Sequence, residues 1–422
     1  MKQVARVLST YSADLFGICS VLYELGGLVV MHDASGCNST YNTHDEPRWY
    51  DIESMIYISG LIENDVILGN DEKLIDDVIE AAEETNPKFI AISAALIPLF
   101  MSTDMKGIAR IIEGRTGIPT FGFATNAMDT YVLGGNMVYR EFLDRFCPAL
   151  DGSQAISDSS FISVNLLGVT PLDFSIVGNV EALKEYFKDC GIKVNCCMTM
   201  GCTLSEMAEA YKADVNVVCS SLALDGAKIL NDKYGTPAVL GLPTGKTACC
   251  ELEKLIRESA SDGKSRLLGS ADEITCIPPL EHAKSSFTLR DRAKGGTWII
   301  GEAINAAGIR YTLEHDLGIT EVHILCPTQV DAHILRDGDV MVRDEADIEK
   351  VLKGAKCVIA DPIYRRILTR ENGNLPHFIN IPHEAYSGRM YRSHIPTFIG
   401  AGFTEWLASK LNADEDSIGI ND

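Results

Sequence analysis

Short β-branched runs alternate with amphipathic stretches along most of the chain, and this alternation restricts the fold more than any other feature. Residues 88–125, 160–200 and 355–382 each read as an apolar run, a helical stretch and a second apolar run. A strand followed by a helix and another strand typically forms a parallel βαβ unit. The sequence therefore predicts an α/β fold with mainly parallel sheets.

Two breaks in this periodicity divide the chain into three domains of Rossmann-like size. Small polar residues interrupt the pattern at 151–160, and Pro with polar residues interrupts it around 277–286. A chain of 422 residues is long enough to form about three domains with cores of their own. We expect an N-terminal domain at 1–155, a central domain at 156–285 and a C-terminal domain at 286–422.

The charge balance excludes several kinds of partner. The chain has 59 acidic and 37 basic residues and a formal net charge of -22, and its lysines and arginines form no cluster. Binding to nucleic acid or to an anionic membrane needs a basic patch, so we expect neither. The longest apolar stretch, 89–101, is too short to span a bilayer, and the first residues lack a secretory pattern. We therefore expect a cytoplasmic protein.

Thirteen cysteines in a chain without an export signal point to thiols, metal ligands or clusters rather than to a disulfide framework. Free cysteine is also a common core residue, and we expect that role for most of them. The adjacent Cys196 and Cys197 should point to opposite faces of a strand. Cys202 stands out because its turn precedes a helix N-terminus, a setting that makes thiols more reactive.

The segment 241–247, GLPTGKT, is similar to a nucleotide-binding P-loop but is one residue short of that motif, because position 240 is Leu. We interpret it as a turn that leads into a helix. The helix N-terminus could then contact an anion or a substrate.

Four metal-capable residues, Cys19, Cys37, Cys219 and His383, lie where an α/β chain would present them at the edge of a sheet. Cys19 and Cys37 are too far apart for a Cys-x-x-Cys pair, so they would come from separate loops. Two thiolates are half of what a cubane cluster takes, and a symmetric dimer would supply the other two. The alternative is that both are buried core thiols.

Four segments of the chain resemble the nitrogenase component 1 family. They are 17–50, which contains a cysteine, an apolar stretch and a turn ending in Gly-Cys, and then 63–95, 204–256 and 357–388. The resemblance covers nearly the whole chain and implies three Rossmann-like domains of the nitrogenase component 1 type.

The resemblance also implies the roles of the candidate residues. Cys19 and Cys37 would hold an iron-sulfur cluster at a subunit interface, while Cys219 and His383 would anchor a catalytic or precursor metallocluster. The family commonly has a third cysteine after the strand of the first domain, where this chain has Ala95 or Leu96. A single [4Fe-4S] cluster shared by two chains is therefore expected in place of an eight-iron cluster.

The function implied by the resemblance is that of a nitrogenase-like oxidoreductase. A separate ATP-dependent iron-sulfur reductase would deliver electrons to the interface cluster of a homodimer, or of a heterodimer with a related subunit. A substrate would be reduced at a metallocluster or in a cavity between the domains. Two alternatives stay open: a scaffold of the same family for metallocluster assembly, and a non-redox protein that binds a small ligand or a tetrapyrrole.

Overall fold

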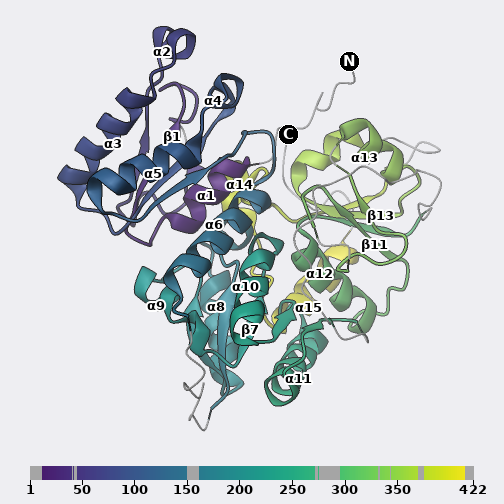
Figure 1. The fold of residues 1–422 in the computed structure, drawn as a ribbon. Coiled ribbons are helices and arrows are strands. Elements are labelled where there is room, and N and C mark those ends of the chain that lie inside the picture. Colours follow the sequence, from purple (N-terminus) through teal and green to yellow (C-terminus); the bar gives the residue numbers. More distant parts are fainter. Residues whose placement is uncertain are drawn as a thin grey trace.

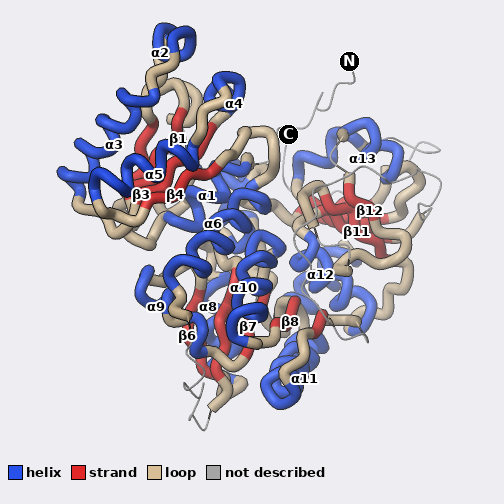
Figure 2. Tube along the Cα trace, viewed as in Figure 1, coloured by secondary structure: helices blue, strands red, loops and turns tan. Residues whose placement is uncertain are grey.

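The computed structural model describes residues 12–39, 41, 45–149, 161–270, 274, 295–330, 333–342, 344–368 and 375–413, except for the side chain of Arg389. These residues form three parallel sheets with helices around them (Figures 1 and 2). We call the parts of the chain that contain them the first region (12–149), the second region (161–270) and the third region (295–413). The expected domain boundaries at 151–160 and 277–286 lie outside the described residues, so the exact boundaries stay predictions.

The first region contains a four-stranded sheet. Its strands are β1 (Leu28–His32), β2 (Met55–Ile58), β3 (Ile90–Ala94) and β4 (Thr120–Phe123). Its helices are α1 (Asp14–Leu22), α2 (Glu63–Leu68), α3 (Asp71–Thr85), α4 (Leu96–Met101), α5 (Met105–Thr116) and α6 (Tyr131–Phe146).

The second region contains a five-stranded sheet. Its strands are β5 (Ser163–Leu167), β6 (Lys193–Cys197), β7 (Val215–Val218), β8 (Ala238–Leu240) and β9 (Arg266–Leu267). Its helices are α7 (Pro171–Phe174), α8 (Asn179–Asp189), α9 (Leu204–Ala208), η2 (Ala210–Lys212), η3 (Ser221–Ala223), α10 (Leu224–Tyr234) and α11 (Lys246–Asp262).

The third region contains the other five-stranded sheet. Its strands are β10 (Thr297–Ile300), β11 (Val322–Cys326), β12 (Val340–Met341), β13 (Cys357–Ala360) and β14 (His377–Asn380). Its helices are α12 (Ala303–His315), α13 (Glu345–Leu352), η4 (Pro362–Ile367), α14 (Gly388–Tyr391), η5 (Arg392–His394) and α15 (Gly402–Leu411).

Every strand pair within the three sheets is parallel. The strand orders are β2-β1-β3-β4, β6-β5-β7-β8-β9 and β12-β11-β10-β13-β14. The second order is that of flavodoxin-like sheets, and the third is that of the dinucleotide-binding fold. The α/β prediction with three Rossmann-like, mainly parallel sheets is therefore confirmed.

Both faces of the first sheet are covered at its central strands, β1 and β3, which are buried at every position and mostly apolar. Alternate side chains such as Val30 and Ile92 pack against α3 and α5, while Val29 and Ala91 face the core that contains α1. This pattern is typical of parallel sheets with helices on both sides. In the third sheet, the side chains of one face likewise pack against α13 and those of the other face against α12.

The larger core joins all three regions. It contains side chains of α1 and α6, of the second sheet, and of α12 in the third region. Among the described residues, no helix is both long enough and apolar enough to cross a membrane.

Candidate functional site

The carboxyl ends of strands from the second and third sheets meet at one buried place. Asp173 lies in α7 just after β5, and Cys219 directly follows β7. Glu302 follows β10, and His383 lies in the loop after β14. In both sheets these ends include the point where the strand order reverses, which is where open α/β sheets bind ligands.

Asp173 is at the centre of this cluster. Its carboxylate accepts hydrogen bonds from Tyr131 Oη at 2.5 Å and from Ser220 Oγ at 2.6 Å. Its Oδ1 atom lies 3.3 Å from His383 Nε2. Asp173 therefore connects side chains of all three regions. Burial and the nearby charge of Asp173 raise the pKa of Tyr131 well above its usual value, so its hydroxyl stays protonated.

Glu302 is the second buried carboxyl group of the cluster. It caps α12, accepting hydrogen bonds from the N–H groups of Ile304 at 3.1 Å and Asn305 at 2.9 Å. It also accepts from the N–H of Ser221 at 2.9 Å and from the Ser221 hydroxyl. Burial raises the pKa of Glu302, and the charge of Asp173 raises it further. A carboxyl group in this setting holds a proton more readily than an exposed one.

His383 is oriented by its neighbours. Its backbone N–H donates to Asp361 Oδ2 at 2.8 Å, and its ring stacks on Tyr386 with 4.5 Å between the ring centroids. Its Nδ1 atom accepts a hydrogen bond from the N–H of Ala385 at 3.3 Å, which leaves the proton of a neutral ring on Nε2. This Nε2 atom is buried and makes no hydrogen bond within the described structure. It contacts Asp173 Oδ1 at 3.3 Å, so a ligand that bound Nε2 would compete with this carboxylate.

Cys219 lies near this cluster but is covered. Its side chain is 1% exposed and packs in the main core, and burial raises the pKa of its thiol well above the usual value. The nearby cavity has a volume of about 30 Å³ and is lined by residues that include Asp173, Glu302 and His383. Cys219 is not among the described residues that line it. Ser220 and Asp173 thus connect the two predicted anchors, but no cavity joins them.

Cys19 and Cys37 lie in the first region and differ in exposure. Cys19, in α1, is completely buried, whereas Cys37, in the loop after β1, is exposed. Burial raises the pKa of Cys19, and so does the negative charge of Glu46. Glu46 is itself paired with the buried Arg48, with 2.7 Å between Arg48 Nε and Glu46 Oε1.

The expected position of a third cluster cysteine lies at the end of β3. Ala95 is buried there as the N-cap residue of α4, and Leu96 begins that helix. Within the described ranges, no three His, Cys, Asp or Glu side chains gather closely enough to hold a metal ion. The described part of this chain therefore contains no complete ligand set around Cys19 and Cys37.

The P-loop-like segment does not offer a free helix N-terminus. The carboxylate of Asp316 accepts the N–H groups of Lys246 at 2.9 Å and Thr247 at 3.0 Å, at the start of α11. An internal carboxylate thus occupies the place where an anionic ligand was expected. The prediction that the segment is a turn leading into a helix agrees with the structure.

Sequence reasoning did not single out Asp173, Glu302, Asp361 or Tyr131. Three of them have a local signal, because an acidic residue follows a buried apolar run within a few positions. Asp173 directly follows the run SVNLLGVTPL, Glu302 follows TWIIG and Asp361 follows CVIA. Tyr131 carries no such signal, because it reaches Asp173 only through the packing of α6 against the second region.

A family model described as nitrogenase component 1 type oxidoreductase matches residues 25–360. The chain is 25% identical over 244 residues to the nitrogenase iron-molybdenum cofactor biosynthesis protein NifE of Clostridium pasteurianum, covering 56% of this chain and 47% of that protein. It is 20% identical over 358 residues to NifE of Bradyrhizobium diazoefficiens, covering 78% and 62% respectively.

The chain is also 24% identical over 243 residues to one of the subunits of the light-independent protochlorophyllide reductase of Methylocella silvestris, covering 57% of this chain and 46% of that protein. The alignments with the first NifE relatives span between 37% and 62% of their length. The solved structure "Nitrogenase Cp1 at pH 5" has a TM-score of 0.62 at 14% identity and covers 98% of this chain and 90% of that chain. This last likeness concerns the fold.

Proposed function

Because the chain belongs to the nitrogenase component 1 family, we propose that it is the electron-accepting subunit of a two-component reductase. An ATP-dependent iron-sulfur protein would deliver the electrons, and a substrate would be reduced where the second and third regions meet. One observation carries this proposal: Asp173, Glu302 and His383 converge on a buried cavity at the carboxyl ends of two parallel sheets.

The chemistry of this cluster supports a reduction, because multi-electron reductions consume protons. The Tyr131 hydroxyl, the Asp173 carboxylate and the His383 ring form a continuous series of groups that can hold or pass a proton. Glu302 lines the same cavity, and its raised pKa favours a protonated carboxyl group. The buried Nε2 of His383 would be the contact to the substrate.

Cys19 and Cys37 would hold one [4Fe-4S] cluster together with the same two residues of a second chain. The number and type of donors match, because each chain offers two thiols of the same region and a cubane takes four, but Cys19 is fully buried in the described arrangement. Such a cluster supplies single-electron transfer. To bind the cluster, Cys19 would have to become accessible and its thiol would have to lose a proton. The negative charge of Glu46 opposes this deprotonation until a cation is bound.

A metallocluster held by both Cys219 and His383 does not fit the described arrangement. A cavity of about 30 Å³ is about the size of a water molecule, and Cys219 does not line it. We therefore assign no chemical step to such a group. The pairing of Cys219 with His383 stays a prediction that requires the thiol to be uncovered.

A scaffold function is the second candidate, and the NifE relatives favour it. A scaffold would hold a metallocluster transiently and pass it to an acceptor. The two functions differ in what leaves the protein, because a reductase releases reduced substrate whereas a scaffold releases iron. Incubating the loaded protein with an apo component 1 acceptor, followed by separation and iron analysis, distinguishes them.

The first test is iron and sulfide content, EPR and mass in solution for anaerobically purified protein. We expect a dimer with about four irons and a reducible cubane signal. Cys37→Ser should remove the signal, because it removes two of the four thiolates. Cys250→Ser is the matched control, since Cys250 is also exposed but lies on α11.

A monomer without iron would overturn the redox proposal. So would a dimer whose iron content is the same in the wild type and in Cys37→Ser. Substantially more than four irons per dimer would support an additional metallocluster and would favour the acceptor experiment as the next step.

A further inference from the structure

Two buried thiols outside the candidate site lie almost within bonding distance. Cys196 lies in β6, one residue before its end, Cys202 precedes α9, and their Sγ atoms are 3.0 Å apart. Both side chains are 3% exposed. Because a disulfide has an S–S distance of about 2.05 Å, the two sulfur atoms would have to approach by only about 1 Å.

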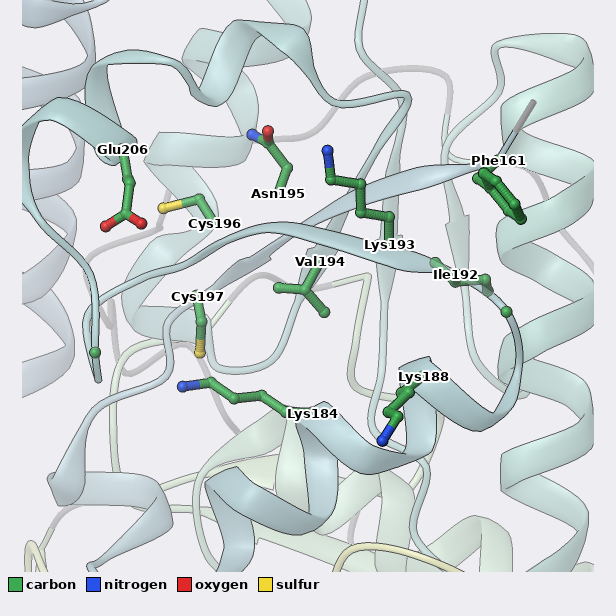
Figure 3. Close-up of a pocket in the computed structure, with 12 residues that line it drawn as sticks. Phe161, Lys184, Lys188, Ile192, Lys193, Val194, Asn195, Cys196, Cys197 and Glu206 are labelled. Atoms are coloured by element: carbon green, nitrogen blue, oxygen red, sulfur yellow. The ribbon is translucent and has the colours of Figure 1, made fainter. Parts of the chain in front are cut away.

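A pocket of about 550 Å³ gives access to one of these thiols. It runs along β6, the edge strand of the second sheet, and Cys196 and Cys197 both line it. Figure 3 shows the two cysteines pointing to opposite sides of the strand, with Cys197 toward Lys184 and Cys196 on the side of Glu206. Cys202 is not among the described residues that line the pocket, so Cys196 is the thiol that a ligand meets first.

The charge of the pocket differs from that of the whole molecule. Lys184, Lys188 and Lys193 line it, against one acidic residue, Glu206. The chain as a whole has a net charge of -22. A locally positive cavity on an acidic protein attracts anions selectively, because anions are repelled from most of the remaining surface.

We propose that Cys196 and Cys202 form a reversible disulfide, and that the pocket admits an anionic low-molecular-weight disulfide as the oxidant. The thiolate of Cys196 attacks one sulfur of this disulfide, which forms a mixed disulfide and releases one small thiol. Cys202 then attacks Cys196 Sγ and releases the second small thiol. The protein loses two electrons and two protons, and the small disulfide is reduced to two thiols.

The bond would close a loop that contacts the first region. Between the two cysteines, the N–H of Gly201 donates to Glu24 Oε2 at 2.6 Å, and the carbonyl oxygen of Thr199 accepts from Arg48 Nη1 at 3.5 Å. Glu24 also pairs with Arg48, with 2.8 Å between Oε1 and Nη1. Oxidation would therefore fix a segment that contacts both members of the Glu24–Arg48 pair. This inference is independent of the proposed reductase function.

The test uses the full-length, anaerobically reduced protein at pH 8, where thiolates are more abundant. The protein is exposed to oxidised glutathione, which is anionic, or to cystamine, which is cationic. Free thiols are then alkylated, and the tryptic peptide 194–212 is analysed by mass spectrometry. We expect this peptide to lose two hydrogens and to carry one alkyl group, on Cys197.

Three variants identify the bond. Cys197→Ser should still form it and leave no thiol to alkylate in the peptide, whereas Cys196→Ser and Cys202→Ser should not form it. A bond that persists in Cys202→Ser, or that is missing in Cys197→Ser, would overturn the assignment of the pair. Because Cys197→Ser is expected to keep the bond, failure of the other two variants to fold would not remove the test.

The rates test the charge of the oxidant. Oxidised glutathione should react several-fold faster than cystamine, and Lys188→Gln should slow its reaction several-fold. Lys254→Gln, an exposed position on α11 away from the pocket lining, should leave the rate unchanged. Equal rates with the two disulfides would overturn the anionic part of the proposal.

Discussion

At the scale of single residues, two buried ionisable groups of the first region make stability depend on pH in opposite directions. Burial raises the pKa of Asp14 to about 6, although the N–H groups of Asn126 and Ala127 donate to it. Burial lowers the pKa of His32 to about 4. As the pH falls from about 6 to 4, protonation of Asp14 in the folded state increases the free energy of unfolding. As the pH falls from about 6.5 to 4, protonation of His32 in the unfolded state decreases it.

The effect of His32 can be isolated by substitution. The unfolded chain binds a proton at this position below about pH 6.5, while the folded chain resists protonation until about pH 4. His32→Asn should therefore retain about 2 kcal/mol more of its unfolding free energy than the wild type when the pH is lowered from 7 to 5. Urea unfolding at both pH values measures this difference. An equal loss in both proteins would contradict the folded-state pKa.

At the scale of elements, α1 and α6 cross in direct contact because glycines lie at the crossing. A Cβ atom at Gly134 would lie 1.8 Å from the backbone oxygen of Asp14, and one at Gly17 would lie 2.1 Å from that of Tyr131. Both contacts are with backbone, which cannot rotate away. The same crossing places Tyr131 at the start of α6, where its hydroxyl reaches Asp173.

Gly134→Ala should accordingly destabilise the protein by about 1–3 kcal/mol or more, since the helices must separate. Gly114→Ala is the matched control. Gly114 lies within α5, and a Cβ atom there would meet nothing within 4 Å. That substitution should leave the melting temperature unchanged or raise it, because alanine favours the helix by up to about 1 kcal/mol. Similar melting temperatures for the two variants would show that the crossing can relax.

At the scale of the whole molecule, the largest core is continuous through the three regions. It joins side chains of α1, of β5 and β7, and of α12 and α15. The smaller cores of the first and third sheets lie on the far faces of those sheets. No single region therefore keeps all of its buried surface when the others unfold.

We expect one cooperative unfolding transition in scanning calorimetry of the reduced protein, with the calorimetric and van't Hoff enthalpies equal. Separated domains would give several transitions with smaller enthalpies. Two resolved peaks would mean that the shared core contributes less to the stability of each region than the contacts within its own sheet do. The same scan on Gly134→Ala indicates whether loosening the α1–α6 crossing divides the transition.

The sequence was sufficient to predict the features that depend on the arrangement of residues close together along the chain. Alternation of apolar runs and amphipathic stretches indicated parallel sheets, and the missing residue before GLPTGKT excluded a P-loop. Resemblance of four segments identified the family, which the family model confirms. The cluster roles of Cys19 and Cys37 stay predictions, because they depend on a second chain.

Tertiary structure alone determined how distant residues combine. The sequence shows an acidic residue after each of three apolar runs. Only the strand orders and the packing of the second region against the third bring Asp173, Glu302 and His383 to one cavity. The distance between Cys196 and Cys202 depends likewise on the turn between β6 and α9. Periodicity reports on the face that a residue occupies within its own element, whereas burial and side-chain contact depend on how separate elements pack. For this reason the sequence predicted the fold class, the family and one member of the candidate site, His383, whereas its grouping with Asp173 and Glu302 required the tertiary structure.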